Sequence, residues 1–562
     1  MKSFRSSSPS RSFEPAAVEQ KAYKRVDSSH PGMLNQIVNL FSGRGYLLQP
    51  DAADYLMNQS EPLTAAELLA SRLLASQAKS SRVITLDLLR RLEVVDGQGF
   101  AISSPEAAVL VAHAEALAAK AVRDSSAVSI LDSGTEIEPS AAGSDSNTRS
   151  ADDEVGPFVH RIQILQDSSR EPATEGTVQD FAKLFRSRLE KQREFLRRGA
   201  TVRVVSVEAA SHEGSDVAFV GLVRESRVTK FGTVSLEVED ETGFAKVSIG
   251  SDLAKSWDDI VQDEVLMIRA RPAVSRESGH VRRLTAKELH RPELSIPTPI
   301  RRGGSSVVAF VSDIHVGSRN FMKEEWKRFV EWLRSGDELA RRVKYLVAVG
   351  DVVDGVGVYP NQEADLEIET VREQYRLLAE ITAEIREDIK IIMMPGNHDA
   401  VRPAEPQPTF PDGLRRMFDR DRFMFLSNPA MLKIEDTKIL GYHGKSLDDI
   451  IAHVPHLSYQ RPLEAMVQLL KRRHLAPVYG DKTPLAPLHD DKMVISDTPD
   501  VFVCGHIHVA AMGEYRGMRL INAGAWQKQT AFQKVHNITP LAARVPMMDL
   551  RTMEMSMPDF SG

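Results

Sequence analysis

Five short clusters of polar residues stand out in the second half of the chain, each directly after an apolar stretch. In chain order they are Asp313-x-His315, Gly350-Asp351-x-x-Asp354, Gly396-Asn397-His398-Asp399, Gly441-x-His443-Gly444 and Gly505-His506-x-His508. Asp, Asn and His offer oxygen and imidazole nitrogen ligands without a thiolate, a set that suits Mn, Fe or Zn rather than a soft metal. The clusters therefore predict a site for divalent metal ions.

The clusters contain more candidate ligands than one ion needs. In an extended segment or tight turn, residues i and i+2 project to the same side, so two of the clusters can each aim two ligands at one place. Two ions about 3.5 to 4 Å apart can hold a phosphate, provide a nucleophile near neutral pH and neutralise developing charge. We therefore predict a two-metal site for a phosphate ester, with about seven candidate ligands among these clusters.

Each cluster alone has a simpler interpretation. A single His at a strand end is more often a hydrogen-bonded structural residue, and Gly-Asp is common in turns. Five such clusters in succession are hard to explain by independent structural roles. Cys504 lies beside Gly505 and His506, but the apolar residues 501–503 before it indicate a buried strand residue, so we leave it outside the site.

The elements that must position these clusters are predicted to be alternating strands and helices. The apolar stretches 306–311, 344–349 and 389–394 are predicted strands, and residues 326–333 and 364–387 between them have helical periodicity. This order predicts a sheet with a parallel core, whose ligand crevice lies outside the carboxyl ends of the strands. The polar clusters follow those ends.

Residues 200–298 are predicted to form a small barrel of the OB type. The stretches "VSLEVED" and "FAKVSI" alternate apolar and polar residues around a turn, which indicates a β-hairpin, and further short strands flank them. Stacking aromatic residues are few, mainly Phe219, Phe231 and Phe244. A structural or docking barrel is therefore favoured over an independent DNA-binding site.

A basic amphipathic helix is predicted within residues 157–199, with Lys and Arg opposite an apolar face. A solvated basic face is favoured over a phosphate contact. The proline-rich segment 455–488, with "KRRH" at its centre, is interpreted as a subunit-docking or DNA-guiding segment, with an ordinary surface insertion as the alternative. The residues on the apolar face of the helix are Phe181, Leu184, Phe185, Leu189 and Leu196.

The first part of the chain carries no chemical motif. Residues 1–30 are predicted to be a disordered tail, and residues 31–120 a small helical module with apolar residues three and four apart. Residues 121–156 are rich in Ser, Gly, Asp and Glu, which predicts a disordered linker because few apolar groups can be buried.

The composition limits the classes of function. No apolar run approaches the roughly 20 residues of a membrane span, so no membrane role is expected. One cysteine excludes an internal disulfide, and this fits a reducing interior and a cytoplasmic location. The net charge of -7 is not that of a typical nucleic-acid binder, so DNA affinity should be local or come from a partner.

With these five clusters, the sequence resembles the calcineurin-like metallophosphoesterase superfamily from residue 307 to about 527. It resembles one family more closely, the small subunits of archaeal family D DNA polymerases, in "GDVVDGVGVYPNQ", "PGNHDAVRPAEPQP", "YHGKSLDDII" and "INAGAWQKQTAFQK". The resemblance implies an α/β fold in which residues 299–562 form a metallophosphoesterase β-sandwich flanked by helices. An OB-fold β-barrel and a small N-terminal helical module would precede it.

The resemblance also implies roles for individual residues. One metal ion would be held by Asp313, His315 and His508, and the other by Asn397, His443 and His506, with Asp351 bridging. His398 would be the catalytic acid that protonates the leaving oxygen, and Asp354 would orient its ring. Asp399 has a weaker claim, as a support for the turn. The ions would be two divalent metals, most simply Mn²⁺, with Fe²⁺ or Zn²⁺ as alternatives.

The implied function is a 3'-5' exonuclease that proofreads for a heteromeric replicative DNA polymerase. The implied partners are the large catalytic subunit of the family D polymerase, single-stranded or mismatched 3' ends of DNA, and the sliding clamp. Two alternatives remain: a non-catalytic scaffold subunit, and a stand-alone metallophosphodiesterase acting on small substrates. The complete ligand set argues against the first, and the polymerase-like segments and additional modules argue against the second.

Overall fold

The computed structural model describes residues 158–562 with gaps at 173, 199–201, 214, 231, 275–280, 298–302, 304, 531–532 and 535–537. Before residue 158 it describes only residues 47–48, 52, 55–56 and 83–84. The chain forms two compact units, residues 1–149 and 150–562. In the first, β1 (Leu47–Leu48) pairs in parallel with β2 (Val83–Ile84). The predicted tail, helical module and linker otherwise lie outside the described residues.

A closed five-stranded barrel forms within residues 204–290. The predicted hairpin is present as β6 and β7, and pairing between β5 and β8 closes the barrel. Phe219 is buried in its core and Phe244 is exposed, whereas Phe231 lies outside the described residues. The strand order is β5-β6-β7-β9-β8. The elements are β4 (Val204–Val205), α8 (Val207–Ala210), β5 (Val217–Val228), β6 (Val234–Asp240), β7 (Gly243–Ile249), α9 (Ser251–Ala254), β8 (Val265–Val274) and β9 (Val281–His290).

The predicted basic helix is α7 (Val178–Arg198), and its basic residues are not all solvated. Leu184, Leu189 and Leu196 are buried as expected. Arg188, however, is 1% exposed and forms an ion pair with Asp491, with 3.0 Å between Nε and Oδ2. The prediction of a solvated basic face is therefore wrong at Arg188. Its guanidinium can be buried because the carboxylate of Asp491, 303 residues away in the chain, neutralises its charge.

The basic centre of segment 455–488 also faces the interior. Arg472 lies 3.0 Å from Glu264 of the barrel, and both side chains are 1% exposed. Arg473 stacks on Phe195 of α7, 3.4 Å from the ring centroid. His474 lies 2.9 Å from Asp491. The "KRRH" sequence therefore holds α7 and the barrel of this same chain, and its Arg472, Arg473 and His474 are not placed to guide DNA.

Replacing Arg188 by alanine is expected to lower the free energy of unfolding of the chain by about 3 to 5 kcal/mol, because it leaves a buried carboxylate without its cation. Urea unfolding of the full chain would measure this. The double replacement Arg188→Met with Asp491→Leu removes both charges and should recover most of the loss. Arg198→Ala, which breaks an exposed pair with Glu194 on the same helix, should change little. Equal effects of Arg188→Ala and Arg198→Ala on the free energy of unfolding would contradict a stabilising role for the buried pair of Arg188 and Asp491.

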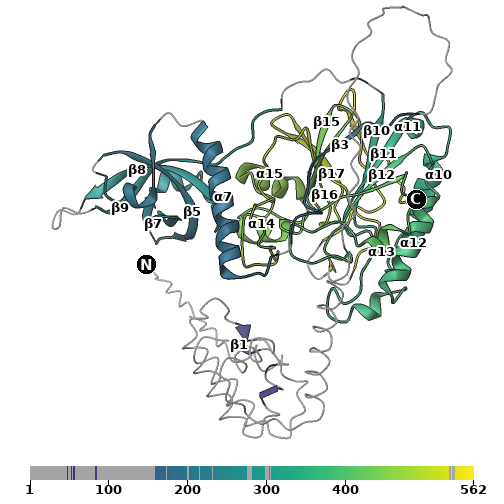
Figure 1. Ribbon diagram of the computed structural model, residues 1–562, viewed down its shortest axis with the longest axis horizontal. Helices are drawn as coiled ribbons and strands as arrows, with labels where there is room; N and C mark the ends of the chain where they lie inside the picture. Colours follow the sequence, from purple (N-terminus) through teal and green to yellow (C-terminus); the bar gives the residue numbers. More distant parts are fainter. Residues whose placement is uncertain are drawn as a thin grey trace, which may run out of the picture. The chain divides into compact units, whose positions relative to one another are not determined.

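The remaining chain forms a sandwich of two six-stranded sheets (Figure 1). The first sheet has the order β13-β12-β11-β10-β19-β20, and its first four strands are parallel, as the alternation of strands and helices predicts. Its strands are β10 (Val307–Val311), β11 (Val343–Val349), β12 (Lys390–Met394), β13 (Phe423–Phe425), β19 (Met547–Asp549) and β20 (Met555–Ser556).

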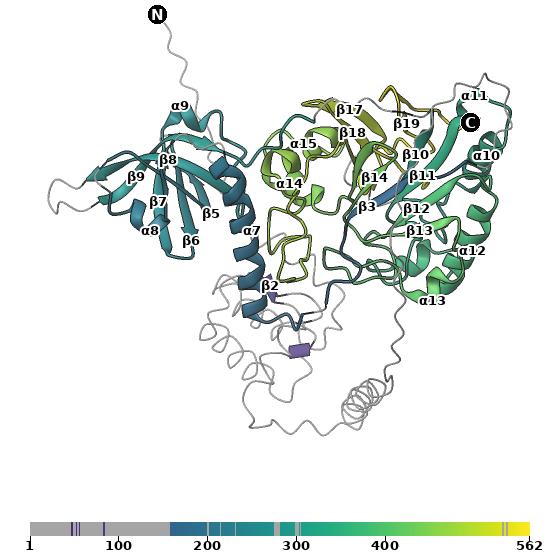
Figure 2. The same ribbon diagram turned by 45° about the horizontal axis from the view of Figure 1, so that its top comes forward.

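The second sheet has the order β17-β18-β16-β15-β14-β3. Its strand β3 (Ile162–Asp167) comes from before α7 and pairs with β14 (Figure 2). The predicted boundary at residue 299 therefore does not enclose the whole sandwich. The other strands are β14 (Ala430–Ile434), β15 (Thr437–Gly441), β16 (Val501–Cys504), β17 (Ala511–Tyr515) and β18 (Met518–Asn522).

Helices cover the outer faces of both sheets. Alternate residues of β10 face opposite sides: Val308 and Phe310 join the core between the sheets, while Val307 and Ala309 pack under α10 and α12. On the outer face of the second sheet, α14 and α15 enclose a separate core that contains Cys504, so this cysteine is buried as predicted. The helices are α10 (Lys323–Leu333), α11 (Glu338–Arg342), η1 (Gln362–Asp365), α12 (Val371–Ala383), α13 (Asp412–Arg415), α14 (Leu447–His453) and α15 (Pro462–Arg472). Within the described part of the chain, no helix is long and apolar enough to span a membrane.

Candidate metal centre

The turns that follow strands of both sheets meet at one place. The Asp313 amide donates to the Gly350 carbonyl at 3.0 Å, which joins the ends of β10 and β11. The Gly505 amide donates to the His443 carbonyl at 2.8 Å, which joins β16 and β15. The His506 amide donates to Asp313 Oδ2 at 2.8 Å and so connects the two sheets. The structure therefore brings together the clusters that the sequence places at separate strand ends.

Most of the predicted ligands have an unusual backbone conformation. A left-handed conformation costs a residue other than glycine of the order of 1 kcal/mol or more, and it persists only where the surroundings enforce it. Here it occurs at alternate residues of two clusters, Asp313 with His315 and His506 with His508. The five predicted ligands with φ between 50° and 65° are Asp313, His315, Asp351, His506 and His508.

A first group of ligands consists of Asp313, His315 and His508, whose ligand atoms all lie within 4.8 Å of one another. His315 Nε2 and His508 Nε2 are 3.2 Å apart, and His508 Nε2 is 3.2 Å from Asp313 Oδ1. That oxygen is buried and accepts no hydrogen bond from any described residue. An acceptor without a donor, surrounded by imidazole nitrogens, fits a divalent cation between these atoms.

A second group consists of Asp351, His443 and His506, with Asn397 beside it. His443 Nε2 lies 3.1 Å from both Asp351 Oδ2 and Asn397 Oδ1. Burial alone would lower the pKa of His443, but the Asp351 carboxylate outweighs it and raises the pKa to about 10. The carboxylate thus concentrates negative charge at this point, as a cation site requires.

Glycines in the clusters allow this close approach. A Cβ on Gly396 would lie 2.3 Å from Asp351 Oδ1, and one on Gly505 would lie 2.6 Å from Asp313 Oδ2. Any side chain at either position would collide with a predicted ligand. The glycines are therefore part of the site, because the absence of a side chain lets the backbone approach the carboxylates closely.

His398 lies beside the ligands. Its amide donates to Asp351 Oδ1 at 2.8 Å, and its Nδ1 lies 2.8 Å from the carbonyl oxygen of Asp354. Burial lowers the pKa of His398 against the attraction of the Asp351 carboxylate. Asp354 thus contacts the ring of His398 through its main chain. Its carboxylate instead lies 2.9 Å from His315 Nδ1, which turns His315 Nε2 toward the first group.

Asp399 supports the turn, in agreement with its weaker predicted role. Its Oδ2 accepts from the Gly396 amide at 2.8 Å, and its Oδ1 accepts from the Tyr375 hydroxyl at 2.8 Å. Burial, followed by the charge of Asp351, raises the pKa of Asp399 to about 7.

Several residues that hold the ligands were missed by the sequence reasoning. Asp448 Oδ2 lies 3.1 Å from His506 Nε2, and Gln533 Nε2 lies 2.8 Å from His508 Nδ1. Gln527 donates to Asp354 Oδ1 at 3.2 Å. Asp448 and Gln533 lie in the segments "YHGKSLDDII" and "INAGAWQKQTAFQK", whose polar residues were the available signal.

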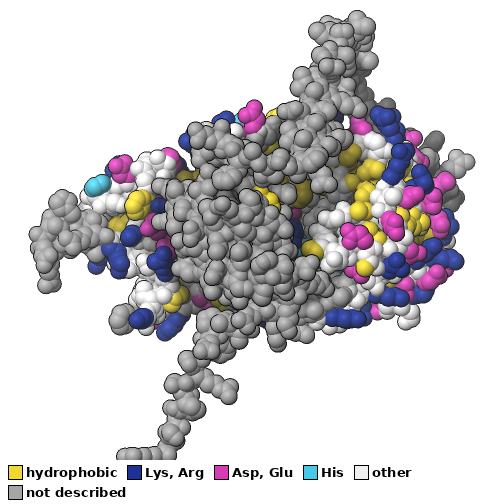
Figure 3. Space-filling view, turned by 90° about the horizontal axis from the view of Figure 1, so that it is seen from below, with side chains coloured by type: hydrophobic (Ala, Val, Ile, Leu, Met, Phe, Trp, Pro, Cys, Tyr) yellow, Lys and Arg dark blue, Asp and Glu magenta, His cyan; other side chains and the backbone are white. Residues whose placement is uncertain are grey.

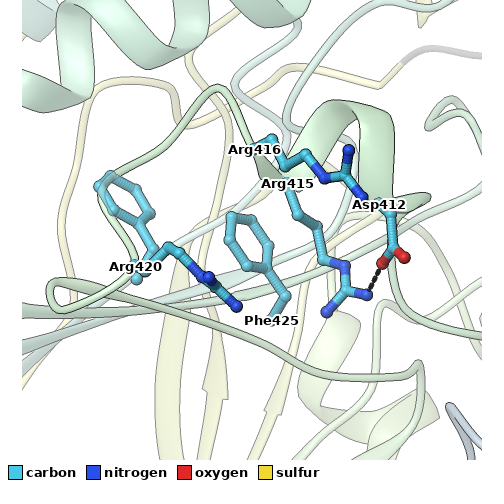
Figure 4. A pocket seen from close by; sticks show the side chains of 6 residues that line it. Asp412, Arg415, Arg416, Arg420 and Phe425 are labelled. Carbon is cyan, nitrogen blue, oxygen red and sulfur yellow. Dashed lines mark hydrogen bonds and ion pairs between the residues drawn. The ribbon is translucent and has the colours of Figure 1, made fainter.

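A cavity of about 500 Å³ lies apart from the predicted ligands (Figure 4). None of the predicted ligands lines it. Arg415 and Asp412 form an ion pair at its wall, and Arg420 points in from the other side past Phe425. Its lining residues are Asp412, Arg415, Arg416, Arg420, Phe423 and Phe425.

Comparisons with known proteins agree with the resemblance. Residues 308–511 match the family of the DNA polymerase alpha/epsilon B subunit. The DNA polymerase II small subunit of Archaeoglobus fulgidus is 39% identical over 404 residues, 70% of this chain and 80% of that protein. That of Halobacterium salinarum is 34% identical over 531 residues, 94% of this chain and 99% of that protein.

A third relative and one solved structure complete the comparison. The DNA polymerase II small subunit of Thermoplasma acidophilum is 39% identical over 386 residues, 68% of this chain and 78% of that protein. A solved archaeal phosphodiesterase is 13% identical, with a TM-score of 0.23, over 45% of this chain and 98% of its own, a likeness too weak to support an argument. From the identity and coverage of the three relatives, the chain belongs to the family of archaeal DNA polymerase II small subunits, the small subunits of family D DNA polymerases.

Proposed function

We propose that this chain is the 3'-5' exonuclease subunit of a heteromeric replicative DNA polymerase and removes mispaired nucleotides from primer ends. The observation that carries the proposal is the convergence of all seven predicted ligands, from both sheets, around His398. A scaffold subunit would have no need to keep buried carboxylates and imidazoles facing one another, since taking charged groups out of water is costly even when they are paired.

The ligand groups suggest where two divalent ions would be held. Asp313, His315 and His508 would hold one ion, and Asn397, His443 and His506 the other, with Asp351 shared between them. When bound, such ions neutralise charge on a phosphoryl group and lower the pKa of water. Mn²⁺ is our first choice and Fe²⁺ or Zn²⁺ the alternatives, because the ligands are only oxygen and imidazole nitrogen.

The chain's own residues would orient the leaving group. With Nδ1 of His398 held by the Asp354 carbonyl, Nε2 is the atom that can carry a proton to the leaving oxygen of the diester. Asp354 and Gln533 fix the rings of His315 and His508 from behind. Asp399 keeps the turn that carries Asn397 and His398 in place.

The partners follow from the family. We propose that the chain assembles with a large catalytic subunit, which would contribute much of the DNA-binding surface, and that the sliding clamp is a further partner. On the face shown in Figure 3, acidic and basic side chains are interspersed over the described surface. Together with the net charge of -7, this favours DNA binding that is local or shared with a partner. We take the barrel to be an OB fold with a docking role.

A substrate panel separates the proposed exonuclease from its alternatives. The chain, alone and co-purified with the large subunit, would be given manganese and either 3'-ended oligonucleotides or nitrophenyl phosphates. We expect mononucleotides from single-stranded and mispaired 3' ends, and little turnover of the monoester. Preferred turnover of nitrophenyl phosphates would favour the stand-alone phosphodiesterase. Inactivity on every substrate, in a stable complex with the large subunit, would favour the scaffold.

A further inference from the structure

The loop at residues 355–361, between Asp354 and η1, exposes three large apolar side chains. Val356 is 43% exposed, Val358 is 36% exposed and Tyr359 is 37% exposed. Single exposed apolar residues are ordinary, but a group of them beside a reactive site marks a surface that meets a ligand. The segment "GVGVYPN" also contains no charged residue, so its chemistry does not suit a phosphate.

The base of this loop is firmly held. Gln362 is fully buried, donates to the Asp354 carbonyl at 2.8 Å, and accepts from the Val358 amide at 2.9 Å. Gln374 is also fully buried, and its side chain accepts from the Gly355 amide and donates to the Gly355 carbonyl. The exposed side chains therefore project from a fixed backbone, which lowers the entropy cost of binding.

The loop is built against the backbone of His398. Gly355 has φ of 71°, and a Cβ there would come within 2.2 Å of the His398 carbonyl oxygen. The Tyr359 ring centroid is 6.2 Å from that of His398, with 57° between the ring planes. The Tyr359 hydroxyl donates to Asp365 Oδ2 at 3.1 Å, which fixes the ring. The two rings are tilted rather than stacked face to face.

We propose that Tyr359, flanked by Val356 and Val358, stacks on an unpaired nucleobase at the 3' end of the DNA strand being cut. This rests on the proposed exonuclease function and names how the site selects its substrate. A nucleobase presents an uncharged aromatic face, and aromatic side chains stack on such faces with little regard to sequence. A base within a duplex hides its faces, whereas a frayed or mismatched terminal base exposes one. The loop thus favours unpaired ends.

The test compares two substrates that differ only in the base. Full-length chain in complex with the large subunit is given manganese and a single strand with either a normal or an abasic 3'-terminal nucleotide. Tyr359→Ala should lower kcat/KM on the normal end by about ten-fold, the usual worth of one stacked base, and leave the abasic end nearly unchanged. Tyr359→Phe and Tyr359→Trp keep an aromatic ring and should retain most of the preference for the normal end over the abasic end.

A matched control is Tyr479→Ala, because Tyr479 is 38% exposed but packs against Phe181 and Phe185 of α7. It should leave the ratio of the two substrates unchanged. Equal loss on both substrates with Tyr359→Ala, or loss of the large subunit instead, would overturn the proposal and make the loop a structural or docking element. If wild-type protein cuts neither substrate, the proposed exonuclease function itself fails, whatever Tyr359 does.

Discussion

Replacement of His398 by alanine should reduce exonuclease turnover by about 10² to 10⁴-fold, the usual contribution of a general acid. The ring nitrogen Nδ1 is held by the Asp354 carbonyl, so removal of the ring removes the proton donor and leaves the carboxylates in place. The backbone amide of residue 398 would still donate to Asp351 Oδ1. We therefore expect the variant to fold, to bind metal as the wild type does, and to fail only in chemistry.

Single-turnover rates on a 3'-labelled mispaired primer, with metal content measured on the same preparation, would test this. His456→Ala is the matched control, because that side chain is 83% exposed and makes only a distant ion pair with Asp258. It should retain the wild-type rate. Full activity of His398→Ala would exclude His398 as the acid, and loss of bound metal would make it a ligand instead.

Replacement of the neighbouring Asn397 by alanine should lower activity for a different reason, namely weaker metal binding. Its Oδ1 lies 3.1 Å from His443 Nε2, within the second ligand group. Removing a residue that only hydrogen-bonds to a metal ligand lowers metal affinity by about 10 to 100-fold. Removing a ligand itself should lower the affinity at least as much. We expect bound manganese to fall from two ions to one per chain, with activity partly restored by excess manganese.

Manganese titration by calorimetry, followed by rates across manganese concentrations, would measure the effect of Asn397→Ala. Gln163→Ala is a control at an exposed amide side chain in β3, and it should leave both the bound manganese and the rates unchanged. If Asn397→Ala retains two ions with wild-type affinity but is inactive at every manganese concentration, Asn397 is not a ligand and acts on the substrate instead.

Much of the site could be predicted because its signal is local. A strand of alternate or continuous apolar residues followed by Asp or His can be recognised within ten residues, and the order of strands and helices places the carboxyl ends together. The burial of Asp313 and His443 at the meeting of the two sheets agrees with this reasoning. What the local pattern left open was the backbone: left-handed turns, rather than extended segments, aim the paired ligands.

The parts that were missed depend on contacts between distant segments. Arg188 lies on the apolar face of its helix, four residues after Leu184, but Asp491, the carboxylate that neutralises it, is 303 residues away and no local pattern indicates it. Strand β3 joins the sandwich from before the barrel, which no local pattern indicates. Asp354 contacts His398 through its carbonyl oxygen and His315 through its carboxylate, and the sequence could not indicate this division because it depends on where His315 lies.

The most direct test of the central claim is metal-dependent release of mononucleotides from a mispaired 3' end. The chain would be purified with its large subunit, stripped of metal with a chelator and then assayed before and after manganese is restored. We expect no release from the stripped protein, and recovery with manganese in the wild type but not in His398→Ala. Release that survives metal removal, or equal recovery in His398→Ala, would contradict it.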